Sequence, residues 1–158
     1  MKTLKALIVS GALLAFATQV FDSPAVASDA TDSFVVVVNP GVPVAKLSAS
    51  ELEAIFSCAR KSWPDGSNIS AFSYAPENAT RRAFDTVVLR MSPDEVARFW
   101  LDQRVRGGAR PPRQVPDPGL AARLTAKLPG SIAFLPESLA TPGLKVVARV
   151  RGGKVLEP

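Results

Sequence analysis

Residues 78–82 combine the groups that a protein uses to hold a small anion. Asn78 is a strong helix N-cap, and the apolar series that follows it predicts a helix start at this point. Such a start leaves backbone N–H groups unpaired and carries partial positive charge, both of which favour an anion. We therefore expect the N–H groups of Ala79 and Thr80, the Thr80 hydroxyl and a guanidinium of Arg81 or Arg82 to act as donors.

Arg81 and Arg82 lie in the first turn of the predicted helix, where positive charge is unfavourable. The helix dipole disfavours a cation in the first turn by a few tenths of a kcal/mol to about 1 kcal/mol. Glu77, surface water or a bound oxyanion would relieve Arg81 and Arg82 of that cost. Exposed arginines that serve only solubility are the alternative, because such arginines are common and the cost is small.

The sequence lacks residues that several kinds of catalytic and metal site require. The sequence contains no histidine, which excludes a histidine-based catalytic triad and an imidazole metal site. No pair of acidic residues suggests a catalytic site, so we expect no enzyme activity and no cofactor. Cys58, the only cysteine, cannot form an intramolecular disulfide and is expected to be a small buried residue. An intermolecular bridge and a reactive thiol remain as alternatives.

The first 27 residues have the layout of a secretory signal peptide. Lys2 and Lys5 precede an apolar run, and a small-residue cleavage site follows. Residues 28–158 are then one domain, predicted to be periplasmic or secreted. No cysteine lies at the cleavage site to carry a lipid, so no stable membrane anchor is expected.

Removal of two lysines and one aspartate with the signal peptide lowers the formal net charge from +5 to +4. A modest basic excess favours anionic partners. Acids such as Asp94 and Asp102 are mixed with the basic residues, so no nucleic-acid partner is expected.

Helices and strands must position this cluster. Ser48 and Glu51 form a capping box that opens a helix, residues 63–66 form a turn, and residues 69–74 are expected to be a strand leading to Asn78. The valine-rich run 34–38 predicts a strand buried on both faces, hence an α/β architecture. We expect further helices at 79–90, at 93–106 with Trp100 in the core, and at 119–127 with leucines every four residues. Ser92 and Glu95 form a second capping box, which opens the helix at 93–106. Strands are expected at 131–135 and 144–150, before a polar tail.

The order of these pieces resembles a known family. The shared motifs are a valine-rich strand before Asn39-Pro40, Leu47-Ser48 with Glu51, Ile55-Phe56, Trp63-Pro64-Asp65-Gly66, Thr80-Arg81 with Phe84, Phe99-Trp100, Pro111-Pro112 and the run 129–134. The sequence is similar to the short phosphate-binding-protein-like family, exported relatives of the substrate-binding component of phosphate ABC transporters. The resemblance implies a type II periplasmic-binding-protein lobe with a mixed sheet flanked by helices, phosphate binding, and an ABC transporter membrane component as a partner.

The sequence departs from full-length members of that family in two respects. It resembles mainly their second lobe. Where they carry an arginine and then Ser-Gly-Thr, this chain has Tyr74 and then Asn78, Ala79 and Thr80. The resemblance therefore implies that Tyr74 also lies beside the anion and that the Asn78 side chain offers a donor. The alternative function is an accessory protein that kept the fold without ligand binding and docks through residues 107–113 or a sheet edge.

Overall fold

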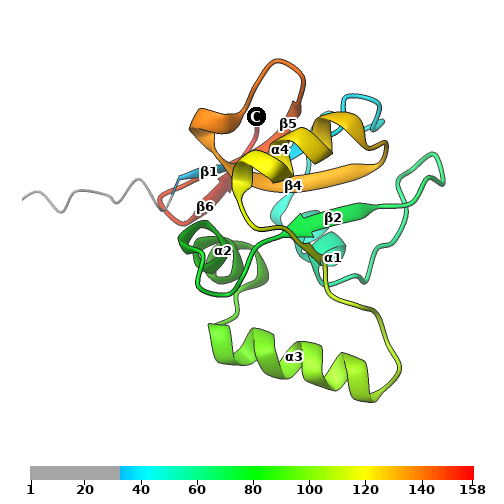
Figure 1. Ribbon diagram of the computed structural model, residues 1–158, viewed down its shortest axis with the longest axis vertical. Helices are drawn as coiled ribbons and strands as arrows, with labels where there is room; N and C mark the ends of the chain where they lie inside the picture. The colour runs from blue at the N-terminus through cyan, green and yellow to red at the C-terminus, as the bar shows by residue number, and fades with distance from the viewer. Residues whose placement is uncertain (1–32) are drawn as a thin grey trace, which may run out of the picture.

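The computed structural model describes residues 33–158. The predicted signal peptide, residues 1–27, lies outside them. Six strands form one mixed sheet in the order β3-β2-β4-β1-β5-β6 (Figure 1). Their bounds are β1 Phe34–Val38, β2 Ser70–Ser73, β3 Arg113–Gln114, β4 Ser131–Pro136, β5 Lys145–Arg151 and β6 Lys154–Leu156.

The first strand lies inside the sheet. All five residues of β1 are buried, which confirms the prediction from the valine run. β1 pairs antiparallel with β4 on one side and β5 on the other, so that Val36 lies opposite both Phe134 and Ala148. Parallel pairing is confined to β2, which joins β3 and β4. The expected mixed sheet is thus present.

Helices flank the sheet as the sequence predicts. The α-helices are α1 Ala49–Phe56, α2 Ala79–Phe84, α3 Pro93–Val105 and α4 Pro118–Lys127. Both predicted capping boxes, Ser48 with Glu51 and Ser92 with Glu95, are formed. The helix expected over 79–90 changes character, since α2 continues as a π-helix, η2 Asp85–Leu89. A short 3-10 helix, η3 Glu137–Leu139, follows β4.

An aromatic cluster joins α1 and α2 to the sheet. The rings of Phe84 and Phe134 stack with centroids 4.1 Å apart, and Phe56 meets Phe84 edge-on at 4.5 Å. Phe34 of β1 lies against both Phe84 and Phe134. Aromatic pairs of this kind add to the free energy gained from burial, so the start of β1 and the end of α2 are held in one core.

The structure corrects three details of the sequence analysis. In α4 the fully buried side chains are Ala121 and Thr125 rather than the leucines of the four-residue repeat, of which Leu120 and Leu124 are partly buried and Leu128 is exposed. Small side chains at the centre of the contact allow the helix to lie close to the strands. The polar tail expected after the last strand contains β6, and the segment 107–113 ends at the first residue of β3.

Helix α3 lies apart from the sheet (Figure 1). Val96 is buried, but Trp100, which we expected in the core, is only half-buried. Leu101 and Val105 are 60% and 78% exposed. Within residues 33–158, no helix has both the length and the apolar character needed to cross a membrane.

Candidate functional site

The chain passes from the carboxyl end of β2 through residues 74–78 into α2. Asn78 has extended backbone angles, φ −68° and ψ 129°, and its Oδ1 accepts a hydrogen bond of 3.0 Å from the Arg81 N–H. This is the N-cap that the sequence predicts. The amide oxygen of Asn78 is therefore occupied by the helix.

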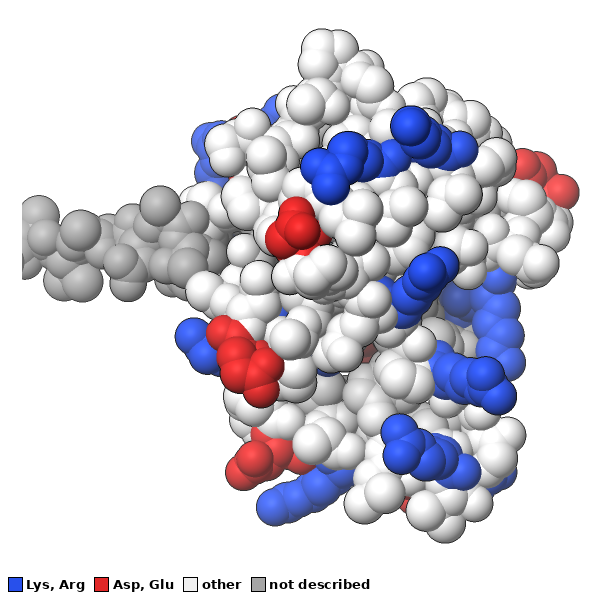
Figure 2. Space-filling view, viewed as in Figure 1, with Lys and Arg blue, Asp and Glu red and all other residues white. Residues whose placement is uncertain are grey.

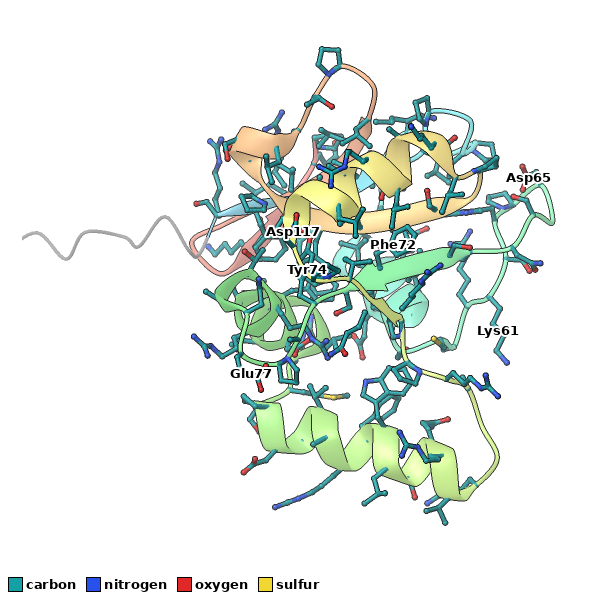
Figure 3. All side chains as sticks on the ribbon, viewed as in Figure 1. Lys61, Asp65, Phe72, Tyr74, Glu77 and Asp117 are labelled. Carbon is teal, nitrogen blue, oxygen red and sulfur yellow. The ribbon has the colours of Figure 1, made fainter. Side chains whose placement is uncertain are left out.

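The guanidinium of Arg81 is bound within the protein. Its Nε lies 2.8 and 2.7 Å from the two carboxylate oxygens of Asp85, and its Nη1 donates to Ser73 Oγ at 2.7 Å and to the Tyr74 carbonyl at 2.9 Å. The acid that relieves Arg81 is therefore Asp85. Glu77, one of the partners we expected, is exposed on the loop before α2 (Figure 3).

Asp85 is almost completely buried, at 4% exposed. Burial raises the pKa of its carboxyl, and the charge and hydrogen bonds of Arg81 act in the opposite direction. The four-residue spacing from arginine to aspartate is a known helix pair and could have been recognised in the sequence. We assigned Arg81 to a ligand instead.

Tyr74 belongs to the core. Its ring is 1% exposed and meets Phe134 edge-on, and its hydroxyl donates to the Phe134 carbonyl at 2.5 Å. Burial raises the pKa of the hydroxyl, so the group stays protonated and keeps this bond. The Tyr74 side chain, which we expected beside the anion, faces the sheet (Figure 3).

Four groups remain at the start of α2. In residues 33–158 no hydrogen bond engages the Thr80 hydroxyl or the N–H groups of Ala79 and Thr80, which are the first two of the helix. Arg82 is exposed and has no carboxylate within 4.0 Å in that part of the chain. Two backbone donors, one hydroxyl and one guanidinium therefore lie in neighbouring positions.

No protein-family model and no curated protein matches this chain. Several solved structures match this chain. The chain is 15% identical to a putative phosphate ABC transporter substrate-binding protein with bound phosphate from Clostridium perfringens, with a TM-score of 0.60, covering 73% of this chain and 44% of that one. It is 16% identical to an ABC-type phosphate transport receptor from Vibrio cholerae, with a TM-score of 0.58 and coverage of 73% and 45%.

PstS from Borrelia burgdorferi gives a similar result, with 14% identity, a TM-score of 0.57 and coverage of 73% and 46%. These likenesses confirm the predicted fold, an α/β lobe of the periplasmic-binding-protein kind. The chain spans less than half the length of the structures it matches.

Proposed function

We propose that this protein is an exported, periplasmic substrate-binding-like protein that holds phosphate or a related small oxyanion at the start of α2. The observation that carries the proposal is the set of unengaged donors at Ala79, Thr80 and Arg82. These donors lie one short loop beyond the carboxyl end of β2. In open α/β sheets, ligands commonly bind beyond the carboxyl ends of the strands. The phosphate-transport proteins that share this fold support the choice of ligand.

The residues of the turn then divide into two roles. Ala79, Thr80 and Arg82 contact the anion, and Arg82 contributes a charge-assisted hydrogen bond worth about 1.5 to 3 kcal/mol. Asn78 and Arg81 hold the turn in shape through the cap and the pair with Asp85. No carboxylate pair or nucleophile is part of this site, so the proposed activity is binding, with an ABC transporter membrane component as the partner.

We expect weak affinity. Arg82 is exposed and Ala79 and Thr80 are only partly buried, so an anion held by these residues remains open to water. Water competes for each donor and screens the charge of Arg82.

A second function is favoured by a different observation. Helix α3 exposes Leu101 and Val105, and residues 107–113 carry two exposed arginines beside it. An accessory protein that docks through this region needs no ligand at α2.

Calorimetric titration of phosphate and of sulfate separates the two functions. We expect heat at millimolar anion from the unsubstituted protein, and none from a variant with Thr80→Ala and Arg82→Gln. Arg98→Gln removes one exposed arginine from α3 and should leave the heat unchanged. No heat from the unsubstituted protein at millimolar anion would favour the accessory function.

Export is tested separately. Expression in a bacterium with two membranes, followed by N-terminal sequencing of the periplasmic fraction, should give Ser28 as the first residue. Recovery of the protein with Met1 in place would contradict export.

A further inference from the structure

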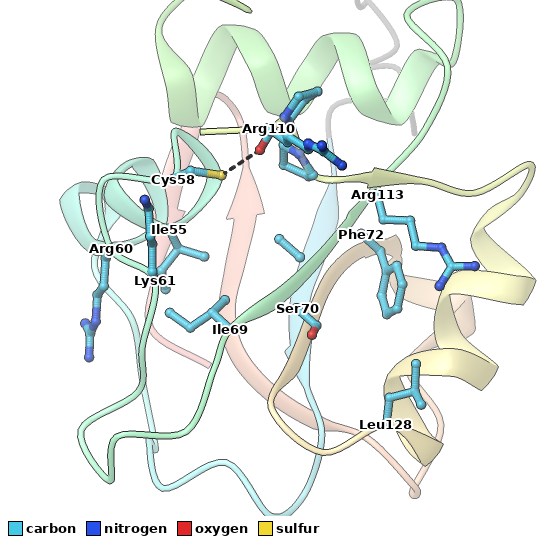
Figure 4. Close-up of a pocket in the computed structure, with 13 residues that line it drawn as sticks. Ile55, Cys58, Arg60, Lys61, Ile69, Ser70, Phe72, Arg110, Arg113 and Leu128 are labelled. Atoms are coloured by element: carbon cyan, nitrogen blue, oxygen red, sulfur yellow. Dashed lines mark hydrogen bonds between the residues drawn. The ribbon is translucent and has the colours of Figure 1, made fainter. Parts of the chain in front are cut away.

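A hollow lies beside β2. It has a volume of about 300 Å³ and is lined by the end of α1, the first three residues of β2 and residues 110–113, the last of which begins β3 (Figure 4). The start of α2 follows the carboxyl end of β2, so the two sites are distinct. We call this hollow the β2 pocket.

The inner wall of the β2 pocket is mainly apolar. Its apolar side chains come from α1, from β2 and the residue before it, and from the end of α4: Ile55, Ile69, Phe72 and Leu128. Pro111 and Pro112 form the edge nearest α3. A volume near 300 Å³ with such a lining matches the lower end of small-molecule sites in proteins.

The rim of the β2 pocket is cationic. Lys61 lies on one side and Arg113 on the other, with Arg110 at the end beside Cys58 (Figure 4). Within residues 33–158, none of these three has a carboxylate within 4.0 Å, and no acidic residue lines the pocket. Figure 2 shows basic side chains gathered on the side of the molecule where residues 107–113 run.

Arg60 differs from the other three cations. One of its guanidinium nitrogens lies 3.5 Å from a Glu51 oxygen, its Nε donates to the Ser62 carbonyl, and the group lies 6.0 Å from the Trp63 ring. It is therefore bound on the protein surface. The charge available to a ligand comes from Lys61, Arg110 and Arg113.

We propose that the β2 pocket binds a small organic anion with an apolar body, such as an aromatic or aliphatic carboxylate or sulfonate. The apolar body lies against the apolar wall, and the acidic group is held at the rim by one of the cations Lys61 and Arg113. Cations around an apolar wall attract negative charge more strongly than the same cations in open water. A free inorganic anion gains the charge but leaves the apolar wall exposed to water, so it binds less well.

Cys58 supplies a reporter inside the pocket. It is half-buried, lines the wall, and its Sγ–H donates to the Arg110 carbonyl at 3.3 Å. Because it is the only cysteine in the sequence, its rate of alkylation reports on this pocket alone. A ligand that fills the pocket covers the thiol.

The probe is 8-anilinonaphthalene-1-sulfonate, which has an aromatic body and one negative charge. Binding is followed by fluorescence for the unsubstituted protein, for Lys61→Gln with Arg113→Gln, and for Arg98→Gln with Arg123→Gln. The last variant removes the same charge from two exposed arginines outside the pocket. We expect Kd to rise about tenfold or more in the first double variant and to change less than about twofold in the second.

Two further measurements complete the test. Saturating probe should slow the reaction of Cys58 with the neutral reagent N-ethylmaleimide at least about fivefold. The reason is that the thiol reacts only in the fraction of protein without bound probe. N-phenyl-1-naphthylamine, which lacks the sulfonate, should bind at least about tenfold more weakly than the anionic probe.

Equal loss of affinity in the two double variants would overturn the proposal, as would unchanged alkylation of Cys58. Displacement of the probe by millimolar phosphate at constant ionic strength would also overturn it, because the site would then be a plain anion site. If the Lys61→Gln and Arg113→Gln variant fails to fold, as checked by circular dichroism, the alkylation result on the unsubstituted protein decides. This test does not depend on the outcome of phosphate binding at α2.

Discussion

The start of α2 follows the end of β2, whereas the β2 pocket lies beside the strand, and the cations of the two regions have different partners. At α2, Arg81 contacts Asp85, Ser73 and the Tyr74 carbonyl. Around the pocket, Lys61 and Arg113 have no carboxylate within 4.0 Å in residues 33–158. The first region uses its charge to hold the fold together, and the second leaves its charge to a ligand or to solvent.

This difference shows how far a cluster of basic residues can be interpreted without its partners. In the sequence, Arg81 and Arg82 look equivalent, and both lie beside unpaired helix donors. In the structure, the Arg81 side chain is 12% exposed and is bound within the protein, whereas Arg82 is exposed. A cation is available for binding only where no acid of the same chain lies close to it.

Removal of Arg81 should give the largest effect. Arg81→Ala leaves the buried carboxylate of Asp85 without its partner, and we expect a loss of about 3 to 5 kcal/mol in the free energy of unfolding. Arg113→Ala removes an exposed cation and should change it by no more than about 0.5 kcal/mol. Urea denaturation of both variants is the measurement. A loss below about 1 kcal/mol for Arg81→Ala would mean that this guanidinium is free for a ligand after all.

The pH dependence of stability should sharpen the same contrast. Because burial holds the folded pKa of Asp85 above its ordinary value of 3.8, the folded chain keeps this proton where the unfolded chain has lost it. The contribution of the Asp85 carboxyl to stability is therefore full below pH 3.8 and declines as the pH rises through the folded pKa.

Urea unfolding between pH 3.5 and 7 should therefore show the unsubstituted protein losing stability relative to Asp85→Asn as the pH rises. The comparison cancels the titration of the other acids. A difference that grows in favour of the unsubstituted protein would show that Arg81 outweighs burial.

Tyr74→Phe should have an intermediate effect. The change removes the hydroxyl that bonds to the Phe134 carbonyl and keeps the ring in place, so we expect a loss of about 1 kcal/mol. Thermal unfolding followed by circular dichroism measures it. Phosphate binding at α2 should stay the same, since the hydroxyl faces the core. A fall in phosphate affinity would show that Tyr74 contributes to the binding site.

The smallest effect is expected in the β2 pocket. Lys61→Gln with Arg113→Gln should change the free energy of unfolding by no more than about 0.5 kcal/mol, because neither side chain has an acidic partner to lose. Denaturation by urea is again the measurement. A loss above about 1 kcal/mol would show that these cations serve the fold, which would remove the contrast between the two regions.

Local signals made most helix and strand positions predictable. Ser48, Asn78 and Ser92 cap their helices as expected, because a cap depends only on the next three residues. The valine run predicted β1 because a strand without polar residues must be buried on both faces. The fold class and the resemblance followed from the order of these elements.

What the sequence did not give depends on distant contacts. The hydroxyl of Tyr74 finds a carbonyl 60 residues away, and β6 exists only because the chain turns back onto β5. The β2 pocket unites residues from α1, β2, the segment 110–113 and α4, which no single stretch of sequence places together. The pair of Arg81 and Asp85 could have been predicted, since the two residues are four positions apart in the chain.

The position of β1 has a consequence for how the molecule is made. This strand ends at Val38, yet its two neighbours begin only at Ser131 and Lys145. A ribosome therefore releases the central strand long before either flanking strand exists, and contacts of such large sequence separation form slowly. We expect the nascent chain to stay unfolded until β4 and β5 have been synthesised, a state that a membrane channel for extended polypeptides can accept.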